Sequence, residues 1–345
     1  MAYTPINKST DYFNTLLYNG NDTADTTITG VGFQSDFTWI KSRLDTENQH
    51  LFDAIRGGGY RLYSNLNDAQ SYIATTLSSW NSDGFVVGTD DGVNKTNGKF
   101  VSWNWKANGL GSSNTDGSIN SIYTSASTTS GFSIVNYTGN GTAGATVGHG
   151  LGKEVKTIII KKYNTTSDWV YGSSGMGFTK YMNLNSTSAE SAYSGMFNNT
   201  APTSSVFTLG SDGQANASGG TYIAYCFADI TGFSKSGSYI GNGDTDGTFV
   251  YTGFKPACVI YKKSSDTDNW RIIDNKRLGY NPNNAFLFPN ITQAESDLTR
   301  FDLLSNGFKL RTADGGDNGS NQTYIYLAIA AAPLVGSNNV PANAR

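Results

Sequence analysis

The sequence contains very little histidine and cysteine. Of its 345 residues, two are histidine, His50 and His149, and two are cysteine, Cys226 and Cys258. None of them has a neighbour at the spacing of Cys/His zinc ligands. Each cysteine lies in an apolar run, which favours buried free thiols, although a disulfide between the two is an open alternative. The sequence therefore carries no motif for a zinc site or for a disulfide framework.

Charge is also scarce, and long hydrophobic runs are absent. Only 15% of residues are charged and the formal net charge is −3, which excludes the basic face that nucleic-acid binding requires. The sequence contains no run of about 18 apolar residues, the length needed to span a membrane. We therefore expect neither a nucleic-acid partner nor membrane insertion. The first residues lack a signal peptide. We therefore expect synthesis in a cytoplasm without export by the standard route.

Catalytic constellations are missing as well. There are four glutamates among 27 acidic residues, and most aspartates stand in Asp-Gly or related turns, where their side chains cap backbone amides. No nucleophile elbow and no phosphate-binding loop in the required strand–loop–helix context occurs. We expect a protein that is not an enzyme, with no catalytic or cofactor-binding residues. A polysaccharide depolymerase, which needs two carboxylates at a defined separation, is the enzymatic alternative.

Glycine and aromatic residues are abundant. The chain has 40 glycines, and 13% of its residues are aromatic. Short runs of aromatic and β-branched residues alternate with Asn-Gly and Asp-Gly turns, which supply the positive φ angles of tight hairpins. This pattern predicts an all-β protein with little helix. The stretch 68–78 (DAQSYIATTLS) is the one helical candidate.

Three related units follow one another along the chain. Segments beginning at Tyr18, Tyr137 and Tyr239 share an aromatic–x–Gly–Asn start, a polar turn and an apolar strand that ends in lysine. Later pieces also correspond: LNDAQSYIA, NSTSAESAY and NITQAESDL, and then the alternating strands GKFVSWNWKA, GTYIAYCFAD and QTYIYLAIAAA. Such repetition predicts three tandem copies of one antiparallel β-sandwich of jelly-roll or concanavalin-like type.

The repeats set the predicted domain boundaries. We expect unit 1 at 1–110, unit 2 at 118–231, and unit 3 with a C-terminal tail at 232–345. Short linkers are predicted at 109–118 and 231–238, with the units packed side by side. The lysine pairs at 161–162 and 262–263 are interpreted as solvated strand ends, with an anion contact as the alternative.

Acidic turns provide the only candidates for a metal. Asp90 and Asp91 lie in GTDDGVN, and Asp244 and Asp246 lie in GNGDTDG. Oxygen-rich turns suit calcium, but neither register matches an EF-hand loop. We therefore expect no metal or other cofactor, with calcium at these four aspartates as the alternative to plain solvated hairpin turns.

Aromatic residues provide the only candidates for ligand binding. Trp169 and Trp270 occupy matching positions of units 2 and 3, and Tyr171 lies beside Trp169 in the sequence. The match favours a shared framework role. The alternative is an exposed ring that stacks on a sugar or is buried at a subunit contact.

Several of these segments resemble a repeated domain of tailed-phage structural proteins, common in marine cyanophages and pelagiphages. The resemblance is carried by GVGFQSDFTWIKSR, HLFDAIRGGGYRLYSN, WNSDGFVVG and NGKFVSWNWKA in unit 1, and by the closing YIYLAIAAAPLVGSNNVPANAR. It is weaker in unit 2, where DWVYGSSG replaces the Asp-x-x-Arg-Gly step. The resemblance implies a lectin-like β-sandwich on a virion surface and brings no catalytic residues.

The resemblance leads to a functional hypothesis. We expect a phage virion surface protein, either a tail fibre or appendage component or a capsid decoration protein. It would act by assembly with other virion subunits and by binding a host surface or glycan. Exposed edge strands and aromatic faces favour homo-oligomers, and a trimer is the form expected in a fibre.

Overall fold

The computed structural model describes residues 4–277, 281 and 283–335. Within these residues the chain is built almost wholly of strands, and every pairing between named strands is antiparallel. Three α-helical segments of four residues each and one 3-10 turn, η1 (Ser9–Asp11), are the helical content. The prediction of an antiparallel all-β protein with little helix is confirmed.

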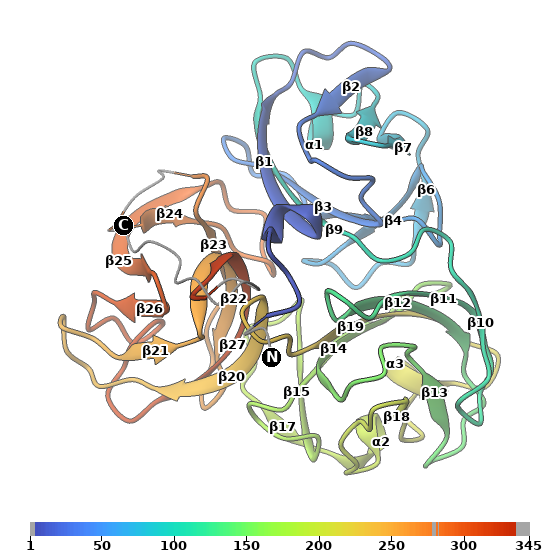
Figure 1. Ribbon diagram of the computed structural model, residues 1–345. Helices are drawn as coiled ribbons and strands as arrows, with labels where there is room; N and C mark the ends of the chain where they lie inside the picture. Colours follow the sequence, from blue (N-terminus) through green and yellow to red (C-terminus); the bar gives the residue numbers. More distant parts are fainter. Residues whose placement is uncertain (1–3, 278–280, 282, 336–345) are drawn as a thin grey trace.

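The sheets fall into three lobes arranged around a common centre (Figure 1). Lobe 1 (9–105) has a six-stranded sheet in the order β1-β9-β3-β4-β5-β6 and a three-stranded sheet, β2-β8-β7. Its elements are β1 (Phe13–Asn19), β2 (Thr26–Thr29), β3 (Phe37–Ser42), β4 (His50–Asp53), β5 (Tyr60–Tyr63), β6 (Ser71–Tyr72), β7 (Leu77–Asn81), β8 (Gly84–Val87), α1 (Asp91–Asn94) and β9 (Lys99–Trp105).

Lobe 2 (112–228) repeats this plan with a longer sheet. Eight strands pair in the order β10-β11-β12-β19-β14-β15-β16-β17, and β13 pairs with β18. The elements are β10 (Ser112–Asn114), β11 (Ser121–Ser127), β12 (Phe132–Thr138), β13 (Thr146–Gly148), β14 (Val155–Lys162), β15 (Trp169–Ser173), β16 (Lys180–Asn183), β17 (Ser191–Ala192), α2 (Ser194–Phe197), β18 (Val206–Thr208), α3 (Gly213–Asn216) and β19 (Thr221–Ala228).

Lobe 3 (234–333) consists of two four-stranded sheets, β20-β27-β22-β23 and β21-β26-β25-β24. Its strands are β20 (Ser234–Ile240), β21 (Phe249–Tyr251), β22 (Phe254–Lys263), β23 (Arg271–Asp274), β24 (Asn283–Phe286), β25 (Ser296–Leu304), β26 (Gly307–Leu310) and β27 (Thr323–Pro333). In each lobe the closing strand of the repeat (β9, β19 or β27) is a central strand of the sheet that begins the lobe.

Alternation along β9 and β19 serves two cores at once, whereas the side chains on both faces of β27 belong to the shared core. In β9, Val101, Trp103 and Trp105 belong to a core shared by all three lobes, whereas Phe100 belongs to a core inside lobe 1. In β19 the odd-numbered residues from Ile223 join the shared core and the even-numbered residues from Tyr222 join a core inside lobe 2. Because successive side chains point to opposite faces of a strand, both faces of the central strands are buried.

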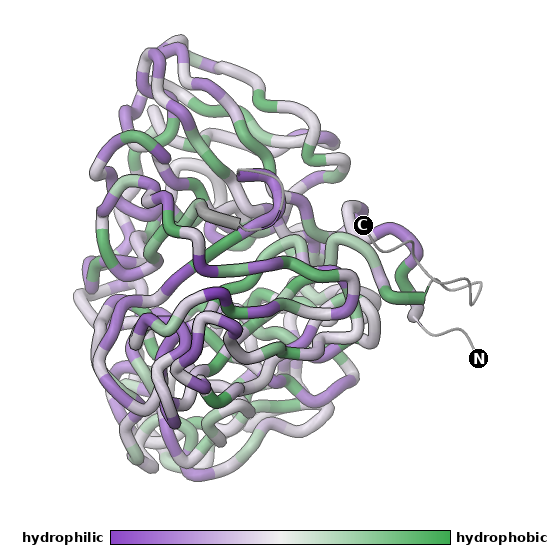
Figure 2. Tube along the Cα trace, turned by 90° about the vertical axis from the view of Figure 1, so that its left-hand side faces the viewer, coloured by the Kyte–Doolittle hydropathy of each residue, from purple (hydrophilic) through white to green (hydrophobic). Residues whose placement is uncertain are grey.

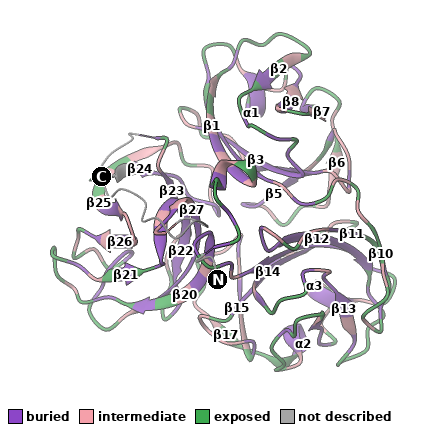
Figure 3. Ribbon diagram, viewed as in Figure 1, coloured by how far each residue is buried: buried purple, intermediate pink, exposed green. Residues whose placement is uncertain are grey.

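The two kinds of core explain the chain's composition. Hydrophobic and hydrophilic residues alternate along much of the trace (Figure 2), and the strands around the centre are buried while the outer loops are exposed (Figure 3). Large aromatic side chains fill the shared core, which includes five of the six tryptophans. The lobes are therefore packed against one another, as expected for units side by side.

Some local predictions hold and others are wrong. Cys226 and Cys258 are buried free thiols, as predicted. The stretch 68–78 is not helical, since it contains β6 and the start of β7, and Tyr72 of β6 pairs with Tyr60 of β5. The predicted linker 109–118 contains β10, which pairs with β11. The unit boundaries 1–110, 118–231 and 232–345 stay a prediction, and the tail residues 336–345 lie outside the described part of the chain.

Candidate functional site at the junction of lobes 1 and 2

The three residues singled out as ligand-binding candidates are buried. Trp169 and Trp270 are 0% exposed and Tyr171 is 1% exposed. Tyr171 and Trp270 pack together with ring centroids 4.6 Å apart. The alternative in which these rings lie exposed for a sugar is therefore wrong, because each ring is enclosed by the shared core.

Trp169 and Trp270 instead tie neighbouring lobes together. Trp169 of lobe 2 donates its indole N–H to the Tyr63 carbonyl of lobe 1 (2.8 Å), and Trp270 of lobe 3 donates to the Asn183 carbonyl of lobe 2 (3.0 Å). Gln49, which holds the corresponding position in lobe 1, donates its side-chain amide to the Phe288 carbonyl of lobe 3 (2.9 Å). The three bonds close a ring, and we call the contacts junction 1–2, junction 2–3 and junction 3–1.

A buried ion pair supports two of the three junctions. Arg56 Nε lies 2.6 Å from Asp53 Oδ2, which also accepts a hydrogen bond from the Tyr225 hydroxyl of lobe 2 (2.8 Å). In lobe 3 the corresponding pair is Arg277 and Asp274 (2.7 Å), and Asp274 accepts from the Trp103 indole of lobe 1 (3.1 Å). The Asp-x-x-Arg step of the repeat is thus a bridge between lobes.

Within the described ranges, junction 2–3 contains neither the ion pair nor the aromatic donor of this bridge. Ser173 and Met176 stand where the other lobes have aspartate and arginine, and Leu327 of lobe 3 stands where an aromatic donor would be. Both members of the ion pair and the donor are replaced together. This agrees with the cost of leaving one buried charge without its partner.

The four aspartates considered for calcium contact other protein groups or are exposed to solvent. Asp90 caps α1 by accepting from the Gly92 N–H (2.9 Å) and pairs with Arg61 (2.9 Å), while Asp91 is exposed. Asp246 pairs with Lys309 (2.7 Å), and Asp244 accepts from the Asp246 N–H (2.9 Å). Across the described residues, no group of three or more His, Cys, Asp or Glu side chains is placed to hold a metal ion.

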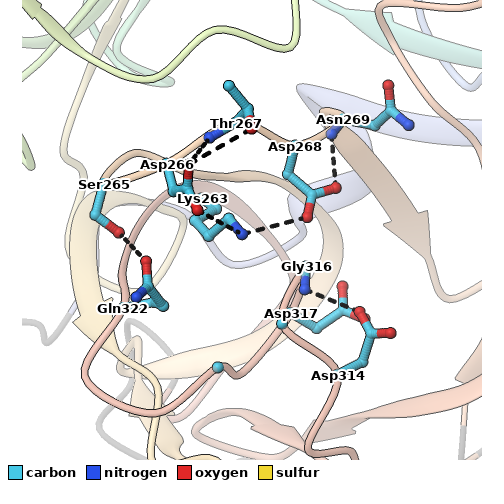
Figure 4. Close-up of polar contacts among 12 residues, drawn as sticks. Lys263, Ser265, Asp266, Thr267, Asp268, Asn269, Asp314, Gly316, Asp317 and Gln322 are labelled. Carbon is cyan, nitrogen blue, oxygen red and sulfur yellow. Dashed lines mark hydrogen bonds and ion pairs between the residues drawn. The ribbon is translucent and has the colours of Figure 1, made fainter.

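A richer acidic cluster in lobe 3 is likewise compensated by cations (Figure 4). Asp317, which is 0% exposed, accepts from the Tyr261 hydroxyl (2.7 Å) and pairs with Arg271 (2.9 Å) and Arg300 (2.7 Å). The Lys263 ammonium lies 3.7 Å from both Asp266 and Asp268. These carboxylates hold loops of lobe 3 together.

The lysines predicted as solvated strand ends are mostly buried. Lys161 and Lys262 are 0% exposed and Lys263 is 8% exposed. Lys161 donates to the Asn67 carbonyl of lobe 1 (2.9 Å) and Lys262 to its neighbour's carbonyl (2.8 Å). Burial lowers the pKa of both ammonium groups to about 8. The interpretation as solvated ends was wrong because loop carbonyls enclose each ammonium group, which the sequence does not show.

Junction 1–2 contains a pocket of about 300 Å³, which we call the junction pocket. Its walls come from β5 and nearby loops of lobe 1 and from β11, β12 and the end of β14 in lobe 2. The lining residues are Ile55, Arg56, Tyr60, Gln70, Ile122, Tyr123, Asn136 and Tyr163. A backbone hydrogen bond from the Gln70 N–H to the Tyr163 carbonyl (2.9 Å) joins the two walls.

Two polar atoms in this wall have no partner within the protein. Gln70 Oε1 and Asn136 Oδ1 are buried and accept no hydrogen bond from the described residues, and Asn136 is only 6% exposed. The Asn136 amide nitrogen donates to the Tyr163 hydroxyl (2.9 Å). Buried acceptors without donors are rare and costly in native proteins. The pocket wall therefore contains two acceptors whose hydrogen-bonding capacity is unused among the described residues.

The pocket carries a cation whose charge is already balanced. The Arg56 guanidinium contacts Asp53 and also donates to the carbonyls of Tyr60 and Leu51 (3.1 Å each). Burial alone lowers the pKa of Arg56, but the charge and hydrogen bonds of Asp53 and Tyr225 outweigh this effect and raise it. The guanidinium therefore stays charged, and its donors are largely committed to protein acceptors.

The repeat makes the junction pocket unlike the corresponding places in the ring. Gln70 corresponds to Glu190 and Glu295, which make the same backbone bond to the next lobe. Glu295 pairs bidentately with Arg43 (2.7 and 2.9 Å), which stands where junction 1–2 has Tyr163. The site was missed from the sequence because its residues are ordinary and come from two units. One signal was present: the aligned AQS, AES and AES triplets differ only at Gln70.

The model of one protein family, described as "Domain of unknown function (DUF7483)", matches residues 8–333. The match spans all three lobes. No curated protein matches the chain. Among the described residues, no helix has the length and apolar character needed to cross a lipid bilayer.

Proposed function

The chain belongs to the family described as "Domain of unknown function (DUF7483)", and we propose that it is a surface structural protein of a tailed-phage virion. In this proposal it acts by contact, through assembly with other virion subunits and through binding to the host surface. Its place of action is the virion, after assembly in the host cytoplasm.

The resemblance to tailed-phage repeats supports this proposal. Three of the four segments that carry it in lobe 1 form β3, β4, β5 and β9, which are consecutive partners in the six-stranded sheet, and the fourth forms the end of β7 and β8 of the smaller sheet. The same strands supply Trp39, Trp103 and Asp53 to the contacts between lobes. Most of the resembling segments therefore form the sheet that contacts the other lobes.

The observation that carries the proposal is how the chain distributes its apolar side chains. The largest rings are buried where lobes meet, while other apolar residues are exposed on outer strands. Ile240, Phe249 and Tyr251 of β20 and β21 are 62%, 43% and 50% exposed. The Thr248 hydroxyl, beside Phe249, donates to the Ile240 carbonyl (2.8 Å), which brings these residues together, and contiguous exposed apolar side chains mark surfaces for protein contact. A rigid ring with such surfaces fits a subunit that works through its exterior.

The finer architecture is part of the proposal. We assign each lobe to the jelly-roll or concanavalin-like β-sandwich class. In lobe 1 this is supported by a core in which Ile40 and Phe100 of the larger sheet pack with Ile28 and Phe85 of the smaller sheet. Face-to-face packing of two antiparallel sheets defines a sandwich.

The position in the virion separates two forms of the proposal. A tail fibre or appendage component would contact the host, and a capsid decoration protein would bind the head lattice. In either form we expect homo-oligomers, with a trimer in a fibre. Light scattering on the purified full chain measures the oligomeric state.

Gold-labelled antibodies against the full chain test the proposal on intact phage particles. We expect label on the tail tip or fibres, or else evenly over the head, and the two patterns distinguish the two forms. Protein found only in infected cells and absent from purified particles would refute the proposal. Release of reducing ends from host polysaccharide would instead identify a depolymerase.

A further inference from the structure

We propose that the junction pocket binds one neutral sugar residue of a host-surface glycan. This inference deepens the proposed function and depends on it only for the source of the sugar. The pocket itself is argued from the residues of junction 1–2.

The first argument is the pair of acceptors without donors. Gln70 Oε1 and Asn136 Oδ1 come from different lobes and both belong to residues of the pocket wall. Sugar hydroxyl groups are donors as well as acceptors, and they reach these two solvent-inaccessible oxygens once the amide groups turn toward the pocket. Side-chain amides fix the orientation of such a ligand because they offer a carbonyl and an NH₂ group at one place.

The second argument is the presence of aromatic surface at the pocket mouth. Tyr60 of lobe 1 and Tyr123 of lobe 2 are 38% and 37% exposed, and both line the pocket. The Tyr60 ring is supported by Tyr72, with centroids 5.1 Å apart. Tyrosine presents an apolar face beside a polar tip, which suits the C–H face and hydroxyl rim of a sugar ring.

The third argument is the charge balance, which favours a neutral ligand. The only cation in the pocket wall is Arg56, whose guanidinium is paired with Asp53 at 2.6 Å. No carboxylate is among the lining residues. An anionic ligand would find no uncompensated positive charge, and a cationic one no negative charge.

The fourth argument is that, among the described residues, these features occur together at junction 1–2. Asn136 corresponds to Leu17 in lobe 1 and Ser238 in lobe 3, as the strand registers show. At junction 3–1, Arg43, Glu295 and Arg277 form an ion-pair network in place of Tyr163, Gln70 and Arg56. A volume of about 300 Å³ is at the small end for ligand sites, which suits one sugar residue.

The test uses the full chain, a glycan array, and titration with methyl glycosides of neutral hexoses and N-acetylhexosamines. Gln70→Glu installs the residue of the other two lobes, and Asn136→Leu installs the residue of lobe 1. Tyr123→Ala removes an exposed ring with little risk to folding. We expect each variant to weaken binding about tenfold or more, because each leaves the sugar with a lost or unpaired contact. Tyr193→Ala, which removes a tyrosine of lobe 2 that is 45% exposed and outside the pocket lining, is the matched control and should bind as the parent does.

Three results would overturn the inference. They are no binding to any neutral sugar, binding that all three pocket variants leave unchanged, and binding of a peptide or nucleoside in preference to sugars. Each of them leaves the virion role intact, since labelling of phage particles measures that role separately. Loss of binding in Tyr123→Ala with the parent's melting temperature supports the inference independently of folding.

Discussion

Junctions 3–1 and 1–2 are built on the same backbone frame with different side chains. In both, the aspartate of an aspartate–arginine pair accepts a hydrogen bond from an aromatic side chain of the next lobe. A backbone N–H of the lobe that carries the pair also donates to a carbonyl at the end of a strand in that next lobe. At junction 3–1 a glutamate and a second arginine extend the ion pair. At junction 1–2 glutamine and tyrosine replace them, and a pocket lies beside them.

The comparison separates what the ring needs from what one junction adds. The indole or amide bonds to neighbouring carbonyls occur at all three junctions and hold the lobes in place. The ion pair occurs at two, and the pocket described here lies at junction 1–2. Gln70 and Asn136 are replaced by other residues at the equivalent places of the other two lobes, so the fold does not require them, which supports the binding role proposed for the pocket.

The largest effect is expected from removing one buried charge at junction 3–1. Asp274→Ala removes the nearer of the two carboxylates that pair with Arg277, which is 0% exposed, and leaves only the longer contact to Glu295 (3.2 Å). We expect the free energy of unfolding to fall by about 3–5 kcal/mol, measured by urea denaturation. Asp53→Ala should cost a similar amount at junction 1–2.

The matched control for this prediction is in lobe 2. Ser173 holds the corresponding position with no arginine beside it, so Ser173→Ala should cost only about 1 kcal/mol. Equal losses in Ser173→Ala and Asp274→Ala would show that the buried ion pair is not what distinguishes the junctions.

The second-largest effect is expected from a substitution that makes junction 3–1 resemble junction 1–2. Glu295→Gln keeps the shape of the side chain but removes the charge that pairs with Arg43 and Arg277. We expect a loss of about 1–3 kcal/mol in unfolding free energy, since these bonds are charge-assisted and partly buried. The loss of unfolding free energy caused by Glu295→Gln should be smaller in a chain that already carries Arg43→Tyr, which copies Tyr163. An equal loss in that chain would show that Glu295 and Arg43 are not coupled.

A smaller effect concerns the buried lysine common to the three lobes. Burial lowers the pKa of Lys41, Lys161 and Lys262 to about 8, below the unfolded value of about 10.5. Between these two values the unfolded chain binds more protons than the folded one, so stability should rise with pH. The measurement is unfolding free energy from pH 8 to pH 9, which stays a full unit below the ordinary tyrosine pKa of 10.0.

Lys161 makes this pH effect a probe of one junction, because its ammonium bonds to Asn67 of lobe 1. Lys161→Met should flatten the pH dependence by on the order of 1 kcal/mol over that range. A slope that stays the same in this variant would mean that other groups cause it.

The smallest effect is expected at junction 2–3. Glu190 pairs there with Lys180, whose side chain is 39% exposed. Because exposed ion pairs contribute little, Lys180→Ala should change unfolding free energy by less than about 1 kcal/mol. A loss of unfolding free energy as large as that of Glu295→Gln would show that the ion pair at junction 2–3 contributes as much as the one at junction 3–1.

Much of the fold could be predicted from the sequence, because the signals are local. Alternation and turn residues predict antiparallel strands, and the repeat places Trp169 and Trp270 at one structural position. The helix predicted at 68–78 failed because DAQSYIATTLS pairs through Tyr72 with Tyr60, a tertiary contact that overrides local helix preference. The buried lysines were missed because the carbonyls that enclose them come from loops.

The candidate site could not be predicted in the same way. Gln49 stands where the other lobes have tryptophan, so its part in the ring has no aromatic signature. The walls of the junction pocket come from 55–70 and 122–163, and only the packing of two lobes brings them together. A sequence identifies Gln70 as the odd member of its repeat, but not that Asn136 lies across from it.

One consequence follows from how the ring closes. Peptide links join lobe 1 to lobe 2 and lobe 2 to lobe 3, whereas lobe 3 meets lobe 1 through side-chain and backbone contacts alone. Thr4 and Pro333 both lie against Gly232, so the described chain enters and leaves the body at one place. A circularly permuted chain could therefore be joined at that place and opened between lobes 1 and 2. Such a chain would keep every lobe, with lobes 3 and 1 joined by a peptide link and lobes 1 and 2 held by side-chain and backbone contacts alone.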